Sequence, residues 1–219
     1  MEDQSDYLGS TSVETPSPAH RFSVVVHSMR IKEDKKRNIN PWKTLSTELK
    51  YDNPWIRVSE SKVIHSNGGD GIYGLVHFKN VAVGILPLDW ENNTYLVGQY
   101  RYALNEYSWE IPEGGSPSGE TILETAKREL EEETGLIAKE WKAILKMHTS
   151  NSVTDEVGYA FVARGLSQGQ AQPENTEDLE IWKVPFEQAF EMTMDGRITD
   201  SLSVVAILKV KLLISRGKL

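Results

Sequence analysis

The 219-residue chain contains no cysteine. Disulfide bonds, thiolate metal sites and a cysteine nucleophile are therefore excluded. No apolar run is long enough to span a bilayer, and residues 1–6, MEDQSD, are acidic and polar, unlike the basic start of a signal peptide. These absences favour a cytoplasmic protein with no membrane partner.

Positive charge is scarce, because 24 Lys and Arg residues stand against 32 Asp and Glu, for a net charge of −8. An acidic surface repels phosphate backbones, so no nucleic-acid partner is expected. Hydrophobic residues make up 39% of the chain, which is enough to bury a sizeable core. The length suits one compact domain with a small additional sheet or tail.

The order of the patterns along the chain predicts the fold class. Residues 1–41 begin with a stretch rich in Ser, Thr, Pro and acids, and they are expected to be disordered or an extension. Apolar alternation or continuity predicts strands at 42–51, 55–65, 72–79, 81–86, 94–100, 140–149, 156–163 and 179–184. Helices are predicted from about Glu120 to Gly135, at 186–195 and at 201–215. This order indicates an α+β sandwich, with 42–79 as an N-terminal β-sheet subdomain and 80–215 as the main domain.

The predicted central helix carries the most informative pattern. At 100° per residue, one stripe is apolar and the opposite side is charged; the stripe consists of Ile122, Leu123, Ala126 and Leu130, and the charged side of Glu124, Lys127 and Glu131. Glu129 falls at the edge of the apolar stripe and Glu133 just inside it, with Glu132 on the next row out. The sequence therefore places two carboxylates, one helical turn apart, against a packed face.

Carboxylates in such a place need a partner. Like charges four residues apart repel each other, and a lower dielectric strengthens the repulsion. Oxygen-only ligands on one helix suit a hard divalent cation such as Mg²⁺. The alternative is a solvated acidic surface, which Glu-rich helices commonly have. The preceding glycines, within Gly114–Gly119, predict a tight turn where backbone can approach a ligand, and this favours the metal interpretation.

The stretch Gly114–Leu136, called the box below, matches the pattern G-x5-E-x7-R-E-U-x-E-E-x-G-U, where U is aliphatic. The constrained positions are Gly114, Glu120, Arg128, Glu129, Leu130, Glu132, Glu133, Gly135 and Leu136. On these residues the chain resembles the Nudix hydrolase family. The resemblance implies an α/β/α sandwich around a mixed β-sheet, and hydrolysis of a nucleoside diphosphate linked to another group.

The resemblance also implies a cofactor and a set of site residues. The cofactor is Mg²⁺, with Mn²⁺ as an alternative. Glu129 and Glu133 are the implied main metal ligands, Glu132 assists, and the backbone carbonyl of Glu113 contributes. Arg128 is implied to orient the glutamates.

Two further segments resemble the ADP-ribose pyrophosphatase and nucleoside diphosphate sugar hydrolase branch; they are Gln99–Tyr102 and Trp109–Gly114. This likeness implies a homodimer in which the antiparallel sheet of residues 42–79 helps to build the partner's site. Arg101 is implied to reach the substrate diphosphate or the adjoining acids, with Glu110 beside it. The alternative for Arg101 is a structural ion pair with Glu110.

In the same branch an acidic loop follows the box, here residues 173–179. Glu177 corresponds to a glutamate that contacts a further metal ion, and Glu174, after a one-residue insertion, to a general base. The alternative for both is a solvated acidic loop. Trp55 or Trp42 could stack on the substrate base, although isolated tryptophans are more often core or dimer contacts.

One departure from the branch concerns specificity. A proline usually follows the box in ADP-ribose pyrophosphatases, where this chain has Asn151 or Ser152, although Thr154-Asp155-Glu156 matches. The expected function is Mg²⁺-dependent hydrolysis of the pyrophosphate of ADP-ribose, or a related nucleoside diphosphate sugar, to a nucleoside monophosphate and a sugar phosphate. The alternatives are a broad nucleoside diphosphate sugar hydrolase without ADP-ribose preference, and a non-catalytic nucleotide-sugar-binding regulatory module.

Overall fold

The computed structural model describes residues 39–169 and 179–219. In chain order the strands and helices are β1 (Lys43–Asp52), β2 (Ile56–Ile64), β3 (Asp70–Phe78), β4 (Val81–Pro87), β5 (Asn93–Arg101), β6 (Glu106–Glu110), β7 (Glu113–Ser116), α1 (Ile122–Thr134), β8 (Leu136–Ile137), β9 (Glu140–His148), β10 (Val157–Arg164), β11 (Ser167–Gln168), β12 (Glu180–Pro185), α2 (Phe186–Met194) and α3 (Ser201–Ser215). Most of the predicted 1–41 segment lies outside the described residues. Among the described helices, none has both the length and the apolar character needed to cross a bilayer.

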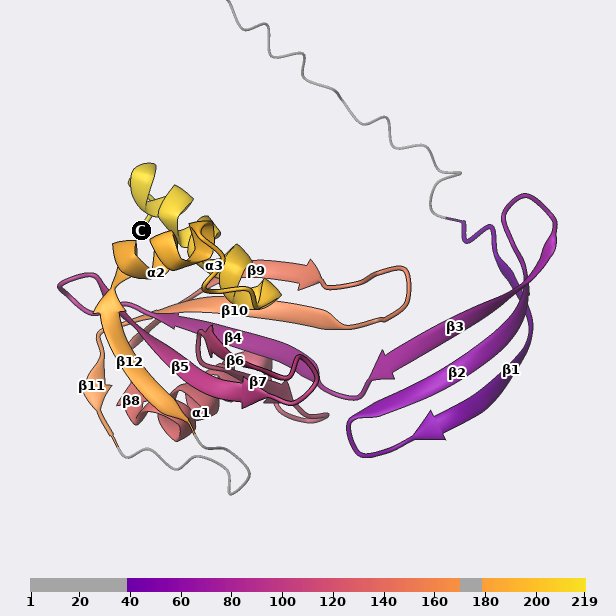
Figure 1. The fold of residues 1–219 in the computed structure, drawn as a ribbon, viewed down its shortest axis with the longest axis horizontal. Helices are drawn as coiled ribbons and strands as arrows, with labels where there is room; N and C mark the ends of the chain where they lie inside the picture. The colour runs from indigo at the N-terminus through magenta and orange to yellow at the C-terminus, as the bar shows by residue number, and fades with distance from the viewer. Residues whose placement is uncertain (1–38, 170–178) are drawn as a thin grey trace, which may run out of the picture. The chain divides into compact units, whose positions relative to one another are not determined.

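Strands β1, β2 and β3 form an antiparallel sheet (Figure 1). They lie where the alternating pattern predicted them. Every residue of β1 is exposed, including the apolar side chains of Leu45, Leu49 and Tyr51. Three large apolar side chains left uncovered along one strand are typical of a surface that meets another molecule.

The central sheet has the strand order β7-β4-β10-β9. Strands β4 and β10 are parallel, with Val83 opposite Tyr159, and the other two pairings are antiparallel. The predicted mixed sheet is therefore confirmed. Strands β12, β5 and β6 form a separate antiparallel sheet, and β8 pairs with β11.

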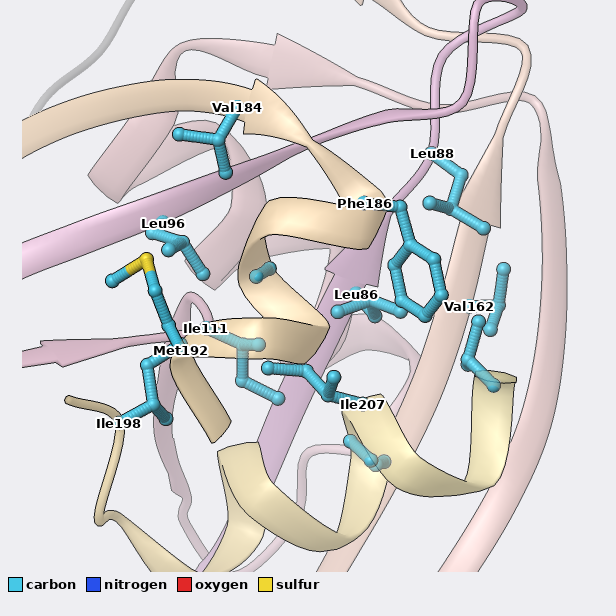
Figure 2. Packing of buried hydrophobic residues seen from close by; sticks show 14 of the residues in the cluster. Leu86, Leu88, Leu96, Ile111, Val162, Val184, Phe186, Met192, Ile198 and Ile207 are labelled. Carbon is cyan, nitrogen blue, oxygen red and sulfur yellow. The ribbon is translucent and has the colours of Figure 1, made fainter. Parts of the chain in front are cut away.

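Helices cover both faces of the central sheet because its strands alternate apolar residues on either side. Val83 and Ile85 of β4 pack with Ala126 and Leu130 of α1. Leu86, the residue after Ile85, points to the other face and packs in a second core that includes residues of helices α2 and α3. Figure 2 shows this second core, which contains Leu86, Leu88, Leu96, Ile111, Val162, Val184, Phe186, Met192, Ile198 and Ile207. The α/β/α layering implied by the resemblance is confirmed.

The boundaries of helix α1 follow from its caps. Thr121 is the N-cap, where its hydroxyl accepts from the backbone N–H of Glu124 at 3.3 Å while the Glu124 carboxylate accepts from the Thr121 N–H at 2.9 Å. Such reciprocal capping stabilises a helix by about 1 kcal/mol. Gly135 ends the helix with a φ of 69°, as glycine does readily. The predicted start near Glu120 was two residues early.

The prediction of a tight turn over Gly114–Gly119 was partly wrong. Glu113–Ser116 is strand β7, which pairs with β4 from Val81 to Gly84. Pairing with a buried strand satisfies the backbone groups of this glycine-rich segment, and this outweighs its low strand propensity. The turn itself is confined to the residues that follow, where Gly119 has a φ of 99°.

Candidate active site

Helix α1 and strand β7 are joined through Glu133. This side chain is only 2% exposed, and its Oε2 accepts a 2.9 Å hydrogen bond from the backbone N–H of Glu113. The helix periodicity predicted that Glu133 would be turned toward the protein body, and this is confirmed. A negative charge on a carboxylate buried this deeply is stabilised by a nearby cation.

Glu129 lies one turn earlier, against the first glycine of β7. A Cβ on Gly114 would stand 2.0 Å from the carboxyl carbon of Glu129. The carboxylate therefore occupies the space that a side chain at position 114 would fill, and only glycine permits this approach. Glu129 is 12% exposed, whereas Glu124, Lys127 and Glu131 on the opposite side are exposed, as predicted.

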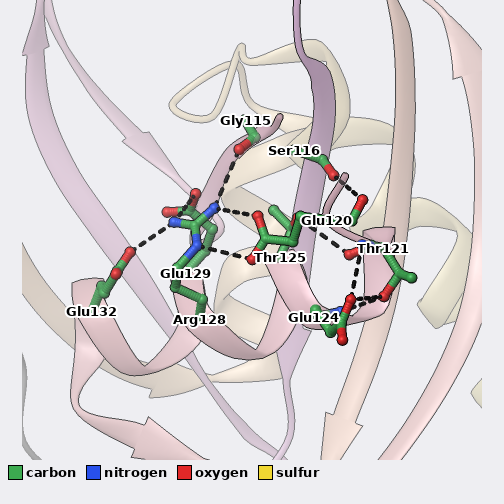
Figure 3. Close-up of polar contacts among 9 residues, drawn as sticks. All are labelled: Gly115, Ser116, Glu120, Thr121, Glu124, Thr125, Arg128, Glu129 and Glu132. Atoms are coloured by element: carbon green, nitrogen blue, oxygen red, sulfur yellow. Dashed lines mark hydrogen bonds and ion pairs between the residues drawn. The ribbon is translucent and has the colours of Figure 1, made fainter. Parts of the chain in front are cut away.

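Arg128 organises three glutamates (Figure 3). Its Nη1 donates to Glu129 at 2.7 Å and to Glu132 at 2.8 Å, and its Nε and Nη2 each donate to Glu120 at 3.1 Å. Nη2 also donates to the carbonyl oxygen of Gly115 at 3.2 Å. The hydrogen bond to Glu120 is the main cause that raises the pKa of Arg128, so the guanidinium stays charged. Arg128 and Glu132 lie four residues apart on α1, so this ion pair spans one turn of the helix.

A second arginine also bonds a residue of β7. Arg101, at the end of β5, donates from Nε to both carboxylate oxygens of Glu110, at 2.9 and 3.1 Å. Its Nη2 also reaches Glu113 at 2.9 Å. Glu110 is 2% exposed. The ion pair between Arg101 and Glu110, the structural alternative for these residues, is therefore present, and Arg101 in addition reaches one of the implied site acids.

Negative charge is concentrated around Glu113. Burial raises the pKa of the Glu113 carboxyl well above its usual value, and the negative charges of Asp200 and Glu110 raise it further, against the opposing effect of Arg101. Such an acid gains from a cation beyond the arginine already present.

These groups border a cavity of about 800 Å³. It is lined by residues from several segments, among them the predicted site residues Trp55, Arg101, Glu113, Arg128 and Glu129. Trp55 is 68% exposed, so its ring is free of core packing. Trp42, the other stacking candidate, packs edge-on against His65 and Tyr73 and does not line the cavity.

Not all predicted site residues reach the cavity wall. Glu133, Glu132 and Glu110 do not line it, although each is bonded to a residue that does. Glu174 and Glu177 lie outside the described residues.

Gly114, Gly115 and Pro117 also line the cavity, within the segment that was expected to approach a ligand. Other lining residues were not predicted as site residues from the sequence; they are Phe78, Asn80, Val81, Ala82, Met147, Thr149, Glu156, Gly158, Asp200, Ser201 and Leu202. Asp200 had a recognisable signal, since an acid just before an apolar helix marks an N-cap, and it accepts from the Ser203 N–H at 2.7 Å.

In the segment Thr154-Asp155-Glu156 the two acids make different contacts. Asp155 accepts from the backbone N–H of Phe78 at 3.0 Å and also bonds His77, which ties this segment to strand β3. Glu156 lines the cavity and accepts from the Thr149 hydroxyl. The segment therefore contributes one structural acid and one acid that faces the candidate site.

The donors suit a hard divalent cation. Among residues 39–169 and 179–219, no three acidic or histidine side chains form a ready-made metal cage. Mg²⁺ does not require one, since it usually binds through one or two carboxylates, waters and substrate phosphate oxygens. Glu113 and Glu129 at the cavity, with Glu133 hydrogen-bonded to Glu113, offer such oxygens.

Two family models match the chain. The NUDIX domain matches residues 78–202, and the nucleoside diphosphate sugar hydrolase N-terminal domain matches residues 42–76. The first spans more than half of the chain and includes the whole α1 region.

The chain matches several curated relatives over most of their length. The chain is 30% identical over 167 residues to a protein named "Methanol dehydrogenase activator" from Bacillus methanolicus, covering 75% of this chain and 90% of that protein. It is also 30% identical over 173 residues to an "ADP-ribose pyrophosphatase" from Mycobacterium tuberculosis (77% and 83% covered). A third relative, an "ADP-ribose pyrophosphatase" from Bacillus subtilis, is 35% identical over 128 residues (58% and 69% covered).

The fold has a solved counterpart. A structure described as "Crystal structure of ADP compounds hydrolase" superposes with a TM-score of 0.73 at 22% identity, covering 81% of this chain and 97% of that one. This likeness confirms the fold, and the relatives and family models confirm the resemblance drawn from the residues. The chain belongs to the Nudix family.

Proposed function

We propose that the chain hydrolyses the pyrophosphate bond of ADP-ribose or a related nucleoside diphosphate sugar, giving a nucleoside monophosphate and a sugar phosphate. Two relatives are named for ADP-ribose hydrolysis, and the N-terminal domain match carries the nucleoside diphosphate sugar name. The observation that carries the proposal is the placement of Glu129 and Glu133. One packs over Gly114 and the other is bonded to the Glu113 N–H, beside a cavity of substrate size.

The proposed cofactor is Mg²⁺, with Mn²⁺ as an alternative; the family depends on divalent metals in general. Glu129 and Glu133 would hold it, with the Glu113 carbonyl, Glu132 and Glu177 as further proposed ligands. A divalent cation supplies charge neutralisation at the diphosphate and activates water for attack. The rest of the chemistry belongs to the protein's own side chains.

The arginines prepare the site for that chemistry. Arg128 holds Glu129 and Glu132 in fixed directions, so their oxygens need no reorganisation when substrate arrives. Arg101 lines the cavity and is 37% exposed. Its guanidinium offers donors suited to a phosphate oxygen while Glu110 holds it in place.

The proposal assigns two further roles, one in binding the nucleobase and one in taking a proton from water. Trp55, exposed at the cavity, is the proposed stacking surface for the nucleoside base. Glu174 or Glu177 is proposed to take the proton from the attacking water; both lie outside the described residues. A general base must lie within hydrogen-bond reach of the water whose proton it takes.

The proposed assembly is a homodimer built through the sheet of residues 42–79. The fully exposed strand β1 supports this proposal, since Leu45, Leu49 and Tyr51 are each more than half exposed in one chain. The domain limits 42–79 and 80–215 and the cytoplasmic location stay predictions.

A turnover assay tests the function. The purified chain is incubated with ADP-ribose and a panel of nucleoside diphosphate sugars, with Mg²⁺, with Mn²⁺ or with excess chelator, and nucleoside monophosphate is measured. Metal-dependent turnover of ADP-ribose above the other sugars supports the proposal in full. Similar rates across the panel favour the broad-specificity alternative.

The regulatory alternative makes the opposite prediction. A non-catalytic module would bind the nucleotide sugar without releasing product under any metal condition. The relative named "Methanol dehydrogenase activator" gives this alternative a specific basis. The complete set of box glutamates in this chain favours catalysis, and binding without turnover would overturn the proposal.

A further inference from the structure

A second cavity, of about 260 Å³, lies at the start of β9 and the end of β10. It shares no lining residue with the candidate active site. Its lining residues are Glu140, Trp141, Lys142, Val162, Arg164, Lys218 and Leu219.

The pairing of β9 with β10 brings charged side chains together at this cavity. Lys142 is paired with Val162, and Glu140 with Arg164, so these four alternate positions share one face of the sheet. That face packs against the core containing Val162 and Leu219. The Nζ of Lys142 donates to the carbonyl oxygen of Lys218 at 2.7 Å, which holds the C-terminal segment against the strand. Three cationic side chains, those of Lys142, Arg164 and Lys218, therefore border the same space as two carboxylates, that of the Glu140 side chain and the terminal one of Leu219.

One donor of the Arg164 guanidinium has no acceptor in this arrangement. Its Nε is buried and has no hydrogen-bond partner among the described residues. A buried donor without an acceptor costs free energy, and native proteins usually satisfy such a group with water or a bound ion. Glu140 stands opposite on β9, but the two side chains form no ion pair within 4 Å in the described part of the chain.

We propose that this cavity is a binding site for a phosphate group, either free phosphate or the end of a phosphate monoester. A guanidinium is a bidentate donor to phosphate, and lysine ammonium groups add charge. The site combines one partly buried arginine with two lysines on a chain whose net charge is −8. A local excess of positive charge on an acidic protein attracts an anion to this place rather than to the surface at large. The inference does not depend on the proposed catalytic function.

The test is an NMR titration of the ¹⁵N-labelled full chain without divalent metal, with inorganic phosphate replacing chloride at constant ionic strength. The amides around Lys142 and Arg164 are expected to shift and saturate. Arg164→Met should weaken the binding roughly tenfold, since a charge-assisted hydrogen bond is lost. Glu140→Gln should strengthen it, because a competing carboxylate charge is removed.

Two further variants keep the test decisive. Lys142→Met, at an exposed position, should also weaken binding with little risk to folding. Lys209→Met makes the same charge change on the exposed side of α3, outside the cavity, and should leave binding unchanged. Methyl phosphate in place of phosphate tells the two sources apart, since tighter binding identifies a monoester. Shifts that do not saturate, or equal weakening by Lys209→Met, would overturn the proposal.

Discussion

The Oε2 of Glu133 accepts a 2.9 Å hydrogen bond from the backbone N–H of Glu113, twenty residues earlier in the chain. This bond joins the last turn of α1 to the first residue of β7, the two elements that border the candidate active site. Its acceptor is a side chain that is 2% exposed. The bond can survive loss of the charge, so geometry and charge at Glu133 can be tested separately.

Glu133→Gln should reduce kcat by two or more orders of magnitude (about 3 kcal/mol or more in the barrier) and leave the fold intact. The amide oxygen can still accept from the Glu113 N–H, whereas the negative charge for a cation is lost. Steady-state kinetics with ADP-ribose and thermal unfolding are the measurements. Glu131→Gln, an exposed position of the same helix, is the matched control and should behave as the parent. A Glu133→Gln rate near that of the parent would refute the metal assignment.

Gly114→Ala should damage activity through Glu129. The new methyl group would lie 2.0 Å from the Glu129 carboxyl carbon, so this side chain must move. We expect kcat to fall at least tenfold, with about 1–3 kcal/mol lost in unfolding free energy. Gly74→Ala, where an added Cβ meets nothing within 4 Å, is the control. Unchanged kcat in Gly114→Ala would show that the position of Glu129 does not matter for turnover.

Arg128→Met should destabilise the protein by about 2–3 kcal/mol, because Glu120, Glu129 and Glu132 would lose their shared donor and repel each other. Chemical unfolding measures the change. Lys127→Met removes the same charge at the neighbouring exposed position and should change stability by less than about 0.5 kcal/mol. Equal effects of the two substitutions would mean that the Arg128 network adds no stability of its own.

Asp89 predicts a pH dependence of stability. Burial acts to raise its pKa, but hydrogen bonds from Lys183, from the side chain and backbone of Asn93 and from the Glu91 N–H outweigh this effect and lower the pKa from 3.8 to about 2. A folded-state pKa below the unfolded one gives stability that is present above pH 3.8 and lost as the pH falls toward about 2.

Asp89→Asn therefore should cost about 1–2 kcal/mol at neutral pH, allowing for the half-exposed Lys183. The difference from the parent should shrink between pH 4 and pH 2, roughly the window set by the two pKa values. Urea unfolding of both proteins across this range measures it. A difference that is the same at all pH values would show that the Asp89 charge does not stabilise the fold.

Leu49→Glu should weaken the proposed dimer. Leu49 is 56% exposed on β1, and a carboxylate there would have to be desolvated on association. We expect the parent to have the mass of a dimer in light scattering and Leu49→Glu to shift toward the monomer, with association at least tenfold weaker. Leu212→Glu, at a 43% exposed position of α3, is the control. A monomeric parent, or an unchanged mass for Leu49→Glu, would contradict the assembly.

Much of the candidate site followed from local periodicity. Positions 122–134 are helical with caps at each end, so their angular positions are known without any tertiary contact. This is why the exposure of Glu124 and the burial of Glu133 could be predicted. Strand β7 could not, because glycine-rich residues have little strand preference and pair only when a neighbouring strand is already in place.

By itself the sequence determined the α1 faces, the box spacing and the order of most strands, because these depend on residues close together in the chain. Only the tertiary structure decided which distant groups come together. Arg101 bonds Glu113, and Asp200 lines the same active-site cavity as these two residues. Arg164 and Lys142 line the second cavity. These contacts between distant residues depend on strand pairing and on the packing of α3 against the sheet. Such long-range contacts are selected by burial and backbone pairing over the whole chain, which no local pattern encodes.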